Sequence, residues 1–263
     1  MISRMNKPVL HSYSIGENVV AFSTTRKGGV SDGNHGELNL NGFCGDDARK
    51  VLINRQMVAA ELGIAAARVL IPHQVHGTDI RQIDEAFLGL SEEAQRSCLD
   101  GIDGMMTNLR NVCIGISTAD CIPVLLYDPV HHASTAVHAG WRGTVARIVE
   151  HAVAEMRRAF HTSPADLKAV VGPGISLKNF EVGQEVYDRF SQAGFDMGRI
   201  AVKNRKWHID LPQCNRLQLM RCGVGESNIR MSPVCTYDHV DEYFSARRLG
   251  IDSGRIYTAI LLK

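Results

Sequence analysis

The chain has 263 residues, with 29 lysines and arginines against 28 aspartates and glutamates, which leaves a formal net charge of +1. A composition of 44% hydrophobic and 22% charged residues is typical of a folded globular protein and excludes a long disordered chain. The near-zero charge and the 6% aromatic content argue against nucleic acid or an anionic membrane as a partner.

The first half of the chain predicts short strands around one long helix. Residues 19–24 have the pattern of a strand that runs into the glycine-rich turn 27–33. Asp46 or Asp47 is suited to cap a helix that Gly63 ends. The expected buried face of this helix contains Val51, Leu52, Val58 and Leu62. Further strands are predicted around Ile80 and over residues 104–107, 112–117, 122–128 and 134–138.

Two more helices are predicted in the second half. Thr144 opens a helix in which apolar residues recur at helical spacing as far as Phe160. Asp210, with a proline two residues behind it, marks the start of a third helix that ends near Gly223.

Strands at 167–171 and 256–262 complete the predicted elements. Because several strands follow one another without helices between them, a strictly alternating parallel fold is disfavoured. The sequence therefore predicts an α+β fold with mixed β-sheets covered by helices. Since no repeat or linker-like run interrupts the chain, we expect a single domain over residues 1–263.

Segment 117–143 carries the most informative side chains. Two strand-like runs flank Asp128-Pro-Val-His131, a tetrapeptide that favours a tight turn. If Asp128 pairs with His131, Cys121 and His138 lie opposite each other at the open end of the hairpin. Such a pair can bind a metal, form a nucleophile with its base, or simply pack as a half-buried cysteine beside a surface histidine.

A third candidate ligand lies in residues 72–77, Pro-His-Gln-Val-His-Gly, which follow a short apolar strand. Either His73 or His76 is displayed there, and His76 is favoured because the backbone can approach closely at the adjacent Gly77. Two histidines and one cysteine thiolate suit zinc, whose catalytic sites keep three protein ligands and an open fourth position. The same donors also suit copper.

These motifs carry a family resemblance that spans nearly the whole chain. Its most specific part is the combination of Ala119-Asp-Cys121 with His138-Ala-Gly-Trp-Arg-Gly143. The other matching segments are 23–31, 38–40, 45–47, 74–77, 172–176, 181–183 and 244–250. The chain resembles the YfiH-type proteins, also described as laccase-domain or multicopper polyphenol oxidase proteins, peptidoglycan editing factors and purine nucleoside phosphorylases. It departs from many members at residues 34–36, where an aromatic residue is usual, and at Ala246, where tyrosine is usual.

The resemblance implies a four-layer α/β/β/α sandwich with zinc bound by His76, Cys121 and His138. It also implies phosphorolysis of adenosine, inosine, guanosine and methylthioadenosine, with deamination of adenosine as a side activity. The chemistry is compatible, because an open zinc activates water for deamination. Zinc with one thiolate and two neutral imidazoles also keeps a positive charge, which stabilises a departing base.

Phosphorolysis further requires an anion site, and arginine is expected there because its planar guanidinium pairs two phosphate oxygens at once. Four arginines lie in the matching motifs: Arg26, Arg142, Arg247 and Arg248. At least one of them is expected to be structural, and Arg26, between a strand and a Gly-Gly turn, is placed to reach over a pocket mouth. Asp120, beside the catalytic candidate Cys121, either orients the site, shuttles a proton or only caps a turn.

Two other functions stay open. Cys121 is a possible nucleophile, with His138 as base, in a thiol hydrolase or editing factor acting on peptidoglycan precursors. A copper-dependent polyphenol oxidase is disfavoured, because none of the 11 histidines forms a His-X-His pair. Seven scattered cysteines without a CxxC pair, and no apolar stretch behind the basic N-terminal residues, predict a cytoplasmic protein with reduced thiols.

Overall fold

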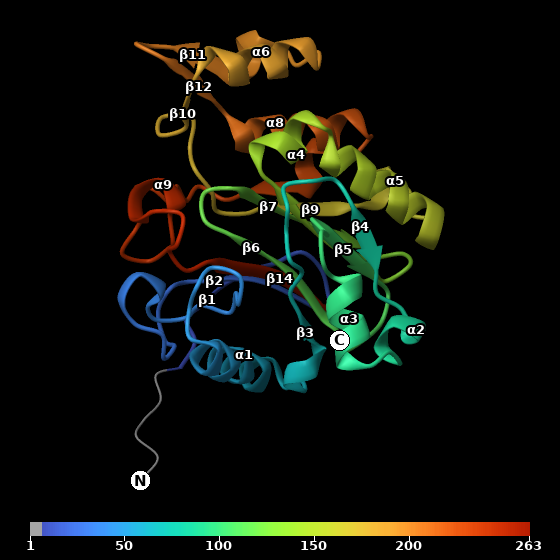
Figure 1. Cartoon of the computed structure of the whole chain (residues 1–263). Helices are drawn as coiled ribbons and strands as arrows, with labels where there is room; N and C mark the ends of the chain where they lie inside the picture. The colour runs from blue at the N-terminus through green and yellow to red at the C-terminus, as the bar shows by residue number, and fades with distance from the viewer. Residues whose placement is uncertain (1–6) are drawn as a thin grey trace.

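Two β-sheets form the centre of the structure, a computed structural model that describes residues 7–263 (Figure 1). The first has the order β1-β2-β14-β6-β3, with β3 parallel to β6 and the other pairs antiparallel. Its strands are β1 (Leu10–Tyr13), β2 (Val19–Thr24), β14 (Ile256–Leu262), β6 (Cys113–Thr118) and β3 (Val69–Leu70). The second has the order β13-β9-β7-β8-β5-β4, with the two outermost pairs parallel. Its strands are β13 (Ile229–Met231), β9 (Lys168–Val171), β7 (Ile122–Asp128), β8 (Ala133–Ala139), β5 (Gly104–Thr107) and β4 (Ile80–Gln82).

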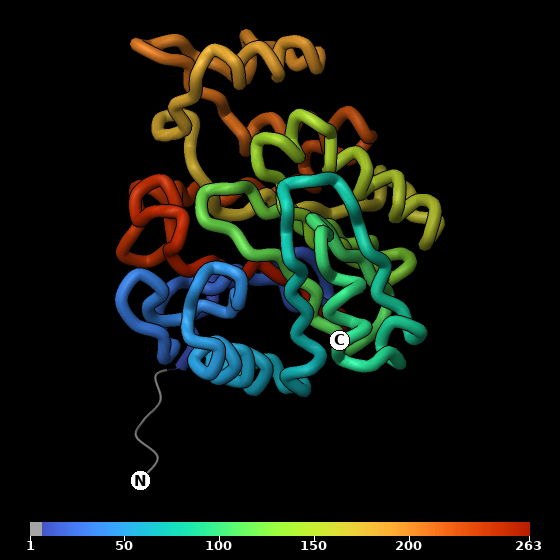
Figure 2. The backbone as a smooth tube through the Cα atoms, viewed as in Figure 1, coloured from blue at the N-terminus to red at the C-terminus, as the bar shows by residue number. Residues whose placement is uncertain are grey.

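A small third sheet projects with α6 from one end of the molecule, and Figure 2 traces this lobe in the orange part of the tube. Its antiparallel strands are β10 (Glu181–Val182), β12 (Trp207–Ile209) and β11 (Ala201–Lys203). The α-helices of the described residues are α1 (Ala48–Leu62), α2 (Glu85–Leu88), α3 (Glu92–Cys98), α4 (Trp141–Val145), α5 (Ile148–Phe160), α6 (Gln184–Gln192), α7 (Met197–Ile200), α8 (Leu211–Arg221) and α9 (Ala246–Leu249). Within the described part of the chain, no helix has the length and apolar character needed to cross a membrane.

The two large sheets stack face to face, and helices cover their outer faces (Figure 1). Apolar side chains from both sheets, such as Ile114 and Leu125, fill the space between them. Val58 and its neighbours pack α1 on the outer face of the five-stranded sheet, while α5 and α8 cover the six-stranded sheet. These layers form an α/β/β/α sandwich, and the α+β expectation is confirmed. The expectation of one domain over residues 1–263 stays a prediction, and residues 1–6, which include much of the basic N-terminal segment, lie outside the described residues.

Several predicted elements have the observed bounds. Strands β2, β7 and β14 have the predicted first and last residues. Helix α1 begins after Asp47, whose carboxylate accepts two N–H groups of the first turn. Gly63 ends it at a φ of 70°, a conformation that glycine adopts without strain. The predicted buried face was wrong at Leu52, which is exposed because it lies about 100° around the helix from Val51.

The turn of the β7–β8 hairpin is longer than predicted. Asp128 pairs with Ala133 rather than with His131. A two-residue hairpin turn favours positive φ at its first central position, whereas Pro129 is restricted to about −65°. The chain instead forms a four-residue loop, in which the Asp128 carboxylate accepts two main-chain N–H groups.

This loop moves the register by two residues, so that His138 lies opposite Pro123 rather than Cys121. Because side chains alternate along a strand, a shift of two residues keeps each side chain on its original face. The predicted proximity of Cys121 and His138 therefore survives an error in the predicted pairing.

The helix predicted to open at Thr144 is two helices instead. Helix α4 begins at Trp141 and α5 at Ile148, and Arg147 between them has a left-handed φ of 64°. The guanidinium carbon of Arg147 lies 3.7 Å from the ring centroid of Phe195, and Nη2 donates to a main-chain carbonyl at 2.7 Å. Tertiary contacts thus hold a break that helical periodicity does not reveal.

Candidate metal centre

Three side chains that are far apart in the sequence converge at one end of the hairpin. His76 belongs to the loop between β3 and β4, Cys121 to the connection between β6 and β7, and His138 to β8. One possible ligand atom from each lies within 4.8 Å of the others, and Cys121 Sγ is 3.9 Å from His76 Nε2. Within residues 7–263, this is the single group of three or more such side chains close enough to hold a metal ion.

A buried carboxylate that the sequence analysis missed holds this cluster together. Asp103 is fully buried and lies 2.7 Å from Nδ1 of His138. It also accepts the main-chain N–H groups of residues 75–77 at distances between 2.7 and 3.2 Å. The proton on Nδ1 points at the carboxylate, which leaves Nε2 of His138 to face the cluster. The available signal was an aspartate directly before the buried strand β5, because a buried carboxylate needs polar partners.

Two further contacts bring the loop of His76 close to its neighbours. The Gln74 side chain donates to the carbonyl of Ser117 at 2.8 Å and accepts the Ser117 N–H at 2.7 Å, which docks the loop on the end of β6. A Cβ atom at Gly140 would lie 2.9 Å from Cδ2 of His76 and 3.1 Å from Sγ of Cys121. Glycine at this position therefore permits the close approach of the side chains.

The electrostatics of the cluster favour a charged sulfur. Burial alone raises the pKa of the Cys121 thiol, but His138 and His76 outweigh burial and lower it to about 6. Burial alone lowers the pKa of His138, but the Cys121 thiolate and Asp103 outweigh burial and raise it to about 9. A thiolate with two imidazoles is a donor set for a transition metal, and a thiolate–imidazolium pair is also a nucleophile.

The cluster opens into a cavity of about 550 Å³, a size usual for small-molecule sites. Besides the three converging side chains, the lining combines rings with two arginines: Phe43, His73, Trp141, Phe180, Arg247 and Arg255. A ligand in this cavity thus meets possible metal ligands, flat apolar surfaces and positive charge together.

The family model described as multi-copper polyphenol oxidoreductase laccase matches residues 20–263. The chain belongs to this family. It is 44% identical over 256 residues to a purine nucleoside phosphorylase of Bacteroides thetaiotaomicron, covering 96% of this chain and 94% of that protein. It is 42% identical over 252 residues to adenosine deaminase RL5 of an unknown prokaryotic organism, covering 94% and 95%. The crystal structure of YfiH from Bacillus licheniformis matches with a TM-score of 0.90 at 28% identity, covering 99% and 98% of the two chains.

The arginines in the family motifs have different surroundings. Arg247 lines the cavity, and its Nη1 donates to the carbonyl of Glu181 at 3.2 Å. Its Nε and Nη2 have no hydrogen-bond partner within residues 7–263. Arg142 lines a neighbouring cavity together with Arg189. Of the four expected arginines, Arg247 is therefore the one with free donors in the main cavity.

Arg26 and Arg248 are not among the residues that line the main cavity. Nε and Nη1 of Arg26 donate to the carbonyls of Gly36 and Val240, both at 2.8 Å. Nη1 of Arg248 donates to the carbonyl of Tyr237 at 3.0 Å. Two nitrogens of Arg26 are thus bound to the carbonyls of residues 36 and 240 rather than free at the main cavity, and the expectation that Arg26 binds phosphate stays a prediction.

The carboxylate of Asp120 joins two segments of the cavity wall. It accepts the hydroxyl of Thr236 and the main-chain N–H of Arg247, each at 2.7 Å. The carbonyl of Asp120 also accepts the N–H of Ile175, within the turn 172–176, at 2.9 Å. The partners of this carboxylate lie in distant segments rather than in its own turn, and its bond to the Arg247 N–H fixes the main chain of Arg247 beside the cavity.

Proposed function

We propose that this chain is a zinc-dependent purine nucleoside phosphorylase, which converts adenosine, inosine and guanosine with phosphate into the base and ribose 1-phosphate. Methylthioadenosine would give adenine and 5-methylthioribose 1-phosphate in the same way. Deamination of adenosine is the proposed side activity. The observation that carries the proposal is the convergence of His76, Cys121 and His138 in a cavity that also contains the free donors of Arg247. The names of the two relatives support purine nucleosides as the substrate class.

The converging side chains fit zinc. Ordinary Zn–S and Zn–N bonds at a tetrahedral angle place sulfur and nitrogen about 3.5 Å apart, and Cys121 Sγ lies 3.9 Å from His76 Nε2. His138 presents Nε2 because Asp103 holds its Nδ1, and Gly140 leaves free the space that a side chain would fill. Bound there, zinc would supply a Lewis acid and lower the pKa of a bound water.

Copper is the alternative metal, because the same donors suit it. A multicopper oxidase needs further histidine clusters, whereas the 11 histidines include no His-X-His pair. The described residues also contain one candidate group rather than several. These observations favour zinc over a multicopper centre.

The phosphate site is assigned to Arg247. Its free Nε and Nη2 form a planar fork suited to two phosphate oxygens, and such charge-assisted pairs are stronger than neutral hydrogen bonds. The carboxylate of Asp120 accepts the main-chain N–H of Arg247 and so fixes the point from which the Arg247 side chain extends. Phosphate held there shares one cavity with the metal ligands, as a reaction between phosphate and a nucleoside requires.

The decisive experiment incubates the purified protein with adenosine, with and without phosphate and with copper excluded, and identifies the products by mass. Adenine and ribose 1-phosphate that form only with phosphate support the proposal, and adenine formed equally fast without phosphate contradicts it. Arg247→Lys keeps the charge but loses the fork, so the phosphate KM should rise about tenfold. Arg248→Lys, outside the cavity, is the matched control and should leave the phosphate KM unchanged.

A second candidate is a thiol hydrolase that acts on peptidoglycan-type amides. Cys121, His138 and Asp103 supply a nucleophile, a base and an orienting carboxylate, with 2.7 Å between His138 Nδ1 and Asp103. Metal analysis discriminates the two functions. Tightly bound stoichiometric zinc occupies the thiolate and contradicts the hydrolase, whereas metal-free protein with amidase activity that alkylation of Cys121 abolishes would support it.

A further inference from the structure

Two stacked rings of the cavity lining, Phe43 and His73, form what we call the rim pair. Both residues line the cavity, and their ring centroids lie 4.4 Å apart with 27° between the planes. Phe43 is 56% exposed, although single exposed apolar residues are common and do not by themselves mark a site. The informative feature is that hydrogen bonds hold the main chain at Phe43 and the ring of His73, while the two rings stack on each other.

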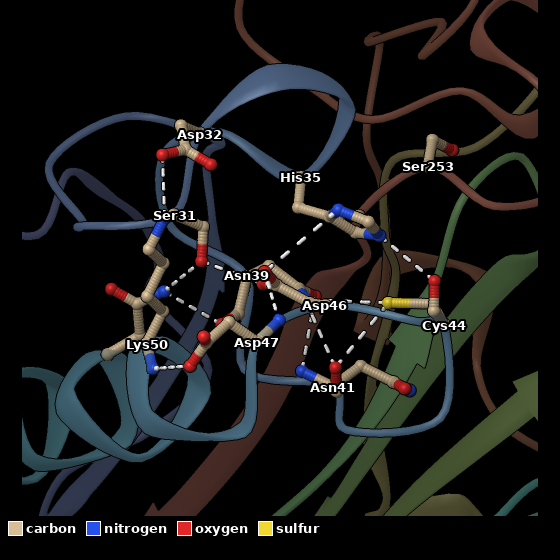
Figure 3. A network of polar contacts seen from close by, with 12 residues as sticks. Ser31, Asp32, His35, Asn39, Asn41, Cys44, Asp46, Asp47, Lys50 and Ser253 are labelled. Carbon is tan, nitrogen blue, oxygen red and sulfur yellow. Dashed lines mark hydrogen bonds and ion pairs between the residues drawn. The ribbon is translucent and has the colours of Figure 1, made fainter.

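Polar contacts of residues 39–44, within the network drawn in Figure 3, hold the loop that carries Phe43. The N–H of Phe43 donates to the side-chain oxygen of Asn41 at 2.6 Å, and the Asn41 carbonyl accepts from the Asn39 side chain at 3.0 Å. After Phe43, the carbonyl of Cys44 lies 2.9 Å from Nε2 of His35. The loop is thus anchored on both sides of Phe43. The ring is exposed although hydrogen bonds hold the main chain that carries it.

The second ring of the rim pair is held from two directions. Nδ1 of His73 lies 2.6 Å from the carboxylate of Asp100. The His73 main chain bonds to the carbonyl of Leu99 at 2.9 Å and to the N–H of Gly101 at 3.0 Å. His73 precedes His76 by three residues, so their Cα atoms are at most about 11 Å apart. One small ligand is therefore able to reach from the rim pair toward the metal ligands.

Apart from the imidazoles of His76 and His138, the cavity has two further rings, those of Trp141 and Phe180, and each has a cation over it. The guanidinium carbon of Arg142 lies 4.3 Å from the ring centroid of Trp141, and that of Arg247 lies 5.6 Å from the centroid of Phe180. In the part of the chain that the structure describes, no lysine or arginine lies over the rim pair. The rim pair thus differs from Trp141 and Phe180 in having no cation over it.

We propose that the rim pair is the base-stacking subsite of the cavity, on which the planar ring of a purine rests while the sugar faces the metal ligands. The inference relies on the proposed function for the identity of the ligand. Stacking on an aromatic face tolerates different bases, because every base has a π-face. A subsite that recognises the ring rather than its substituents explains how one enzyme accepts adenosine, inosine and guanosine.

Calorimetric titration of the purified protein with free adenine, without phosphate, tests the subsite independently of turnover. Phe43→Ala should weaken adenine binding about tenfold, the loss expected when one base–aromatic stack is removed. Phe43→Tyr keeps a flat ring and should retain wild-type affinity. Leu52→Ala is the matched control, because Leu52 is a 54% exposed apolar residue on α1 outside the cavity. Zinc content should be equal in all four proteins.

In phosphorolysis, Phe43→Ala should raise the adenosine KM and leave the phosphate KM unchanged. Equal adenine affinity in wild type and Phe43→Ala would overturn the inference while leaving the proposed function intact. The inference would also be overturned if adenine binding weakened as much in Phe43→Tyr as in Phe43→Ala. An aromatic ring at this position would then not be enough to bind adenine. A wild-type protein that binds neither adenine nor adenosine would refute the proposed function and the inference together.

Discussion

Replacing Asp103 by asparagine tests whether one buried carboxylate holds the candidate metal centre together. The carboxylate accepts four hydrogen bonds, two on each oxygen, from His138 and from the main chain of residues 75–77. An asparagine side chain keeps one acceptor oxygen and turns an NH₂ group toward the two remaining donors. At about 1.5–3 kcal/mol for each bond to a charged group, the free energy of unfolding should fall by about 3–6 kcal/mol.

The same substitution should weaken zinc binding about 10- to 100-fold, because His138 loses the partner that orients its ring. Competition with a chromogenic chelator measures the affinity, and circular dichroism checks that the variant is folded. Asp128→Asn is the matched control, since Asp128 is also buried and contacts His131 Nδ1 at 2.8 Å at the opposite end of the hairpin. It should destabilise the fold and leave zinc affinity unchanged. Wild-type zinc affinity in Asp103→Asn, or equal weakening in both variants, would refute the reasoning.

Three other predictions concern the same region and the hairpin. Gly140→Ala should lower the zinc content measured by mass spectrometry, because its Cβ would lie 2.9 Å from His76; full occupancy would contradict the fit argument. Cys121→Ser should lose most of the zinc while the circular dichroism spectrum is retained, and undiminished zinc would exclude the thiolate as a ligand. Burial raises the pKa of Asp128, but the polar contacts of its carboxylate, first with Thr162 and then with His131 and main-chain N–H groups, outweigh burial and lower the pKa. The stabilisation by this carboxylate is therefore complete above the unfolded pKa of about 3.9 and is lost as pH falls. In urea titrations, the stability difference between wild type and Asp128→Asn should narrow from pH 7 to pH 3, and a constant difference would contradict this assignment.

Local sequence patterns predicted the parts of the fold that local forces determine. Strands β2, β7 and β14 are apolar runs bounded by turn residues, and the ends of α1 are set by Asp47 and Gly63. The projecting lobe was missed because its strands are only two or three residues long and partly exposed. The break at Arg147 was missed because contacts with a distant segment hold it.

The candidate site likewise contains residues that local patterns predict and residues that only tertiary contacts define. His76, Cys121 and His138 lie in motifs with a recognisable pattern, and the structure brings them together. Asp103 was missed because its four partners come from two other segments of the chain, which only the fold brings to it. The arginines could not be ranked from the sequence, because whether a guanidinium is free or bound to carbonyls depends on tertiary contacts. Zinc as the bound metal and the roles of the site residues stay predictions.

Strand β14 has a consequence for how this protein is made. It lies in the middle of the five-stranded sheet, between β2 and β6, although it occupies residues 256–262. While a ribosome synthesises the chain, the earlier strands of this sheet emerge before β14, which joins them. Their apolar faces therefore stay exposed until β14 is made. A chain interrupted before residue 256 lacks the centre of the sheet rather than an edge. Incomplete chains should therefore be substrates for chaperones and proteases instead of persisting as partly active enzyme, so that the folding step itself selects finished molecules.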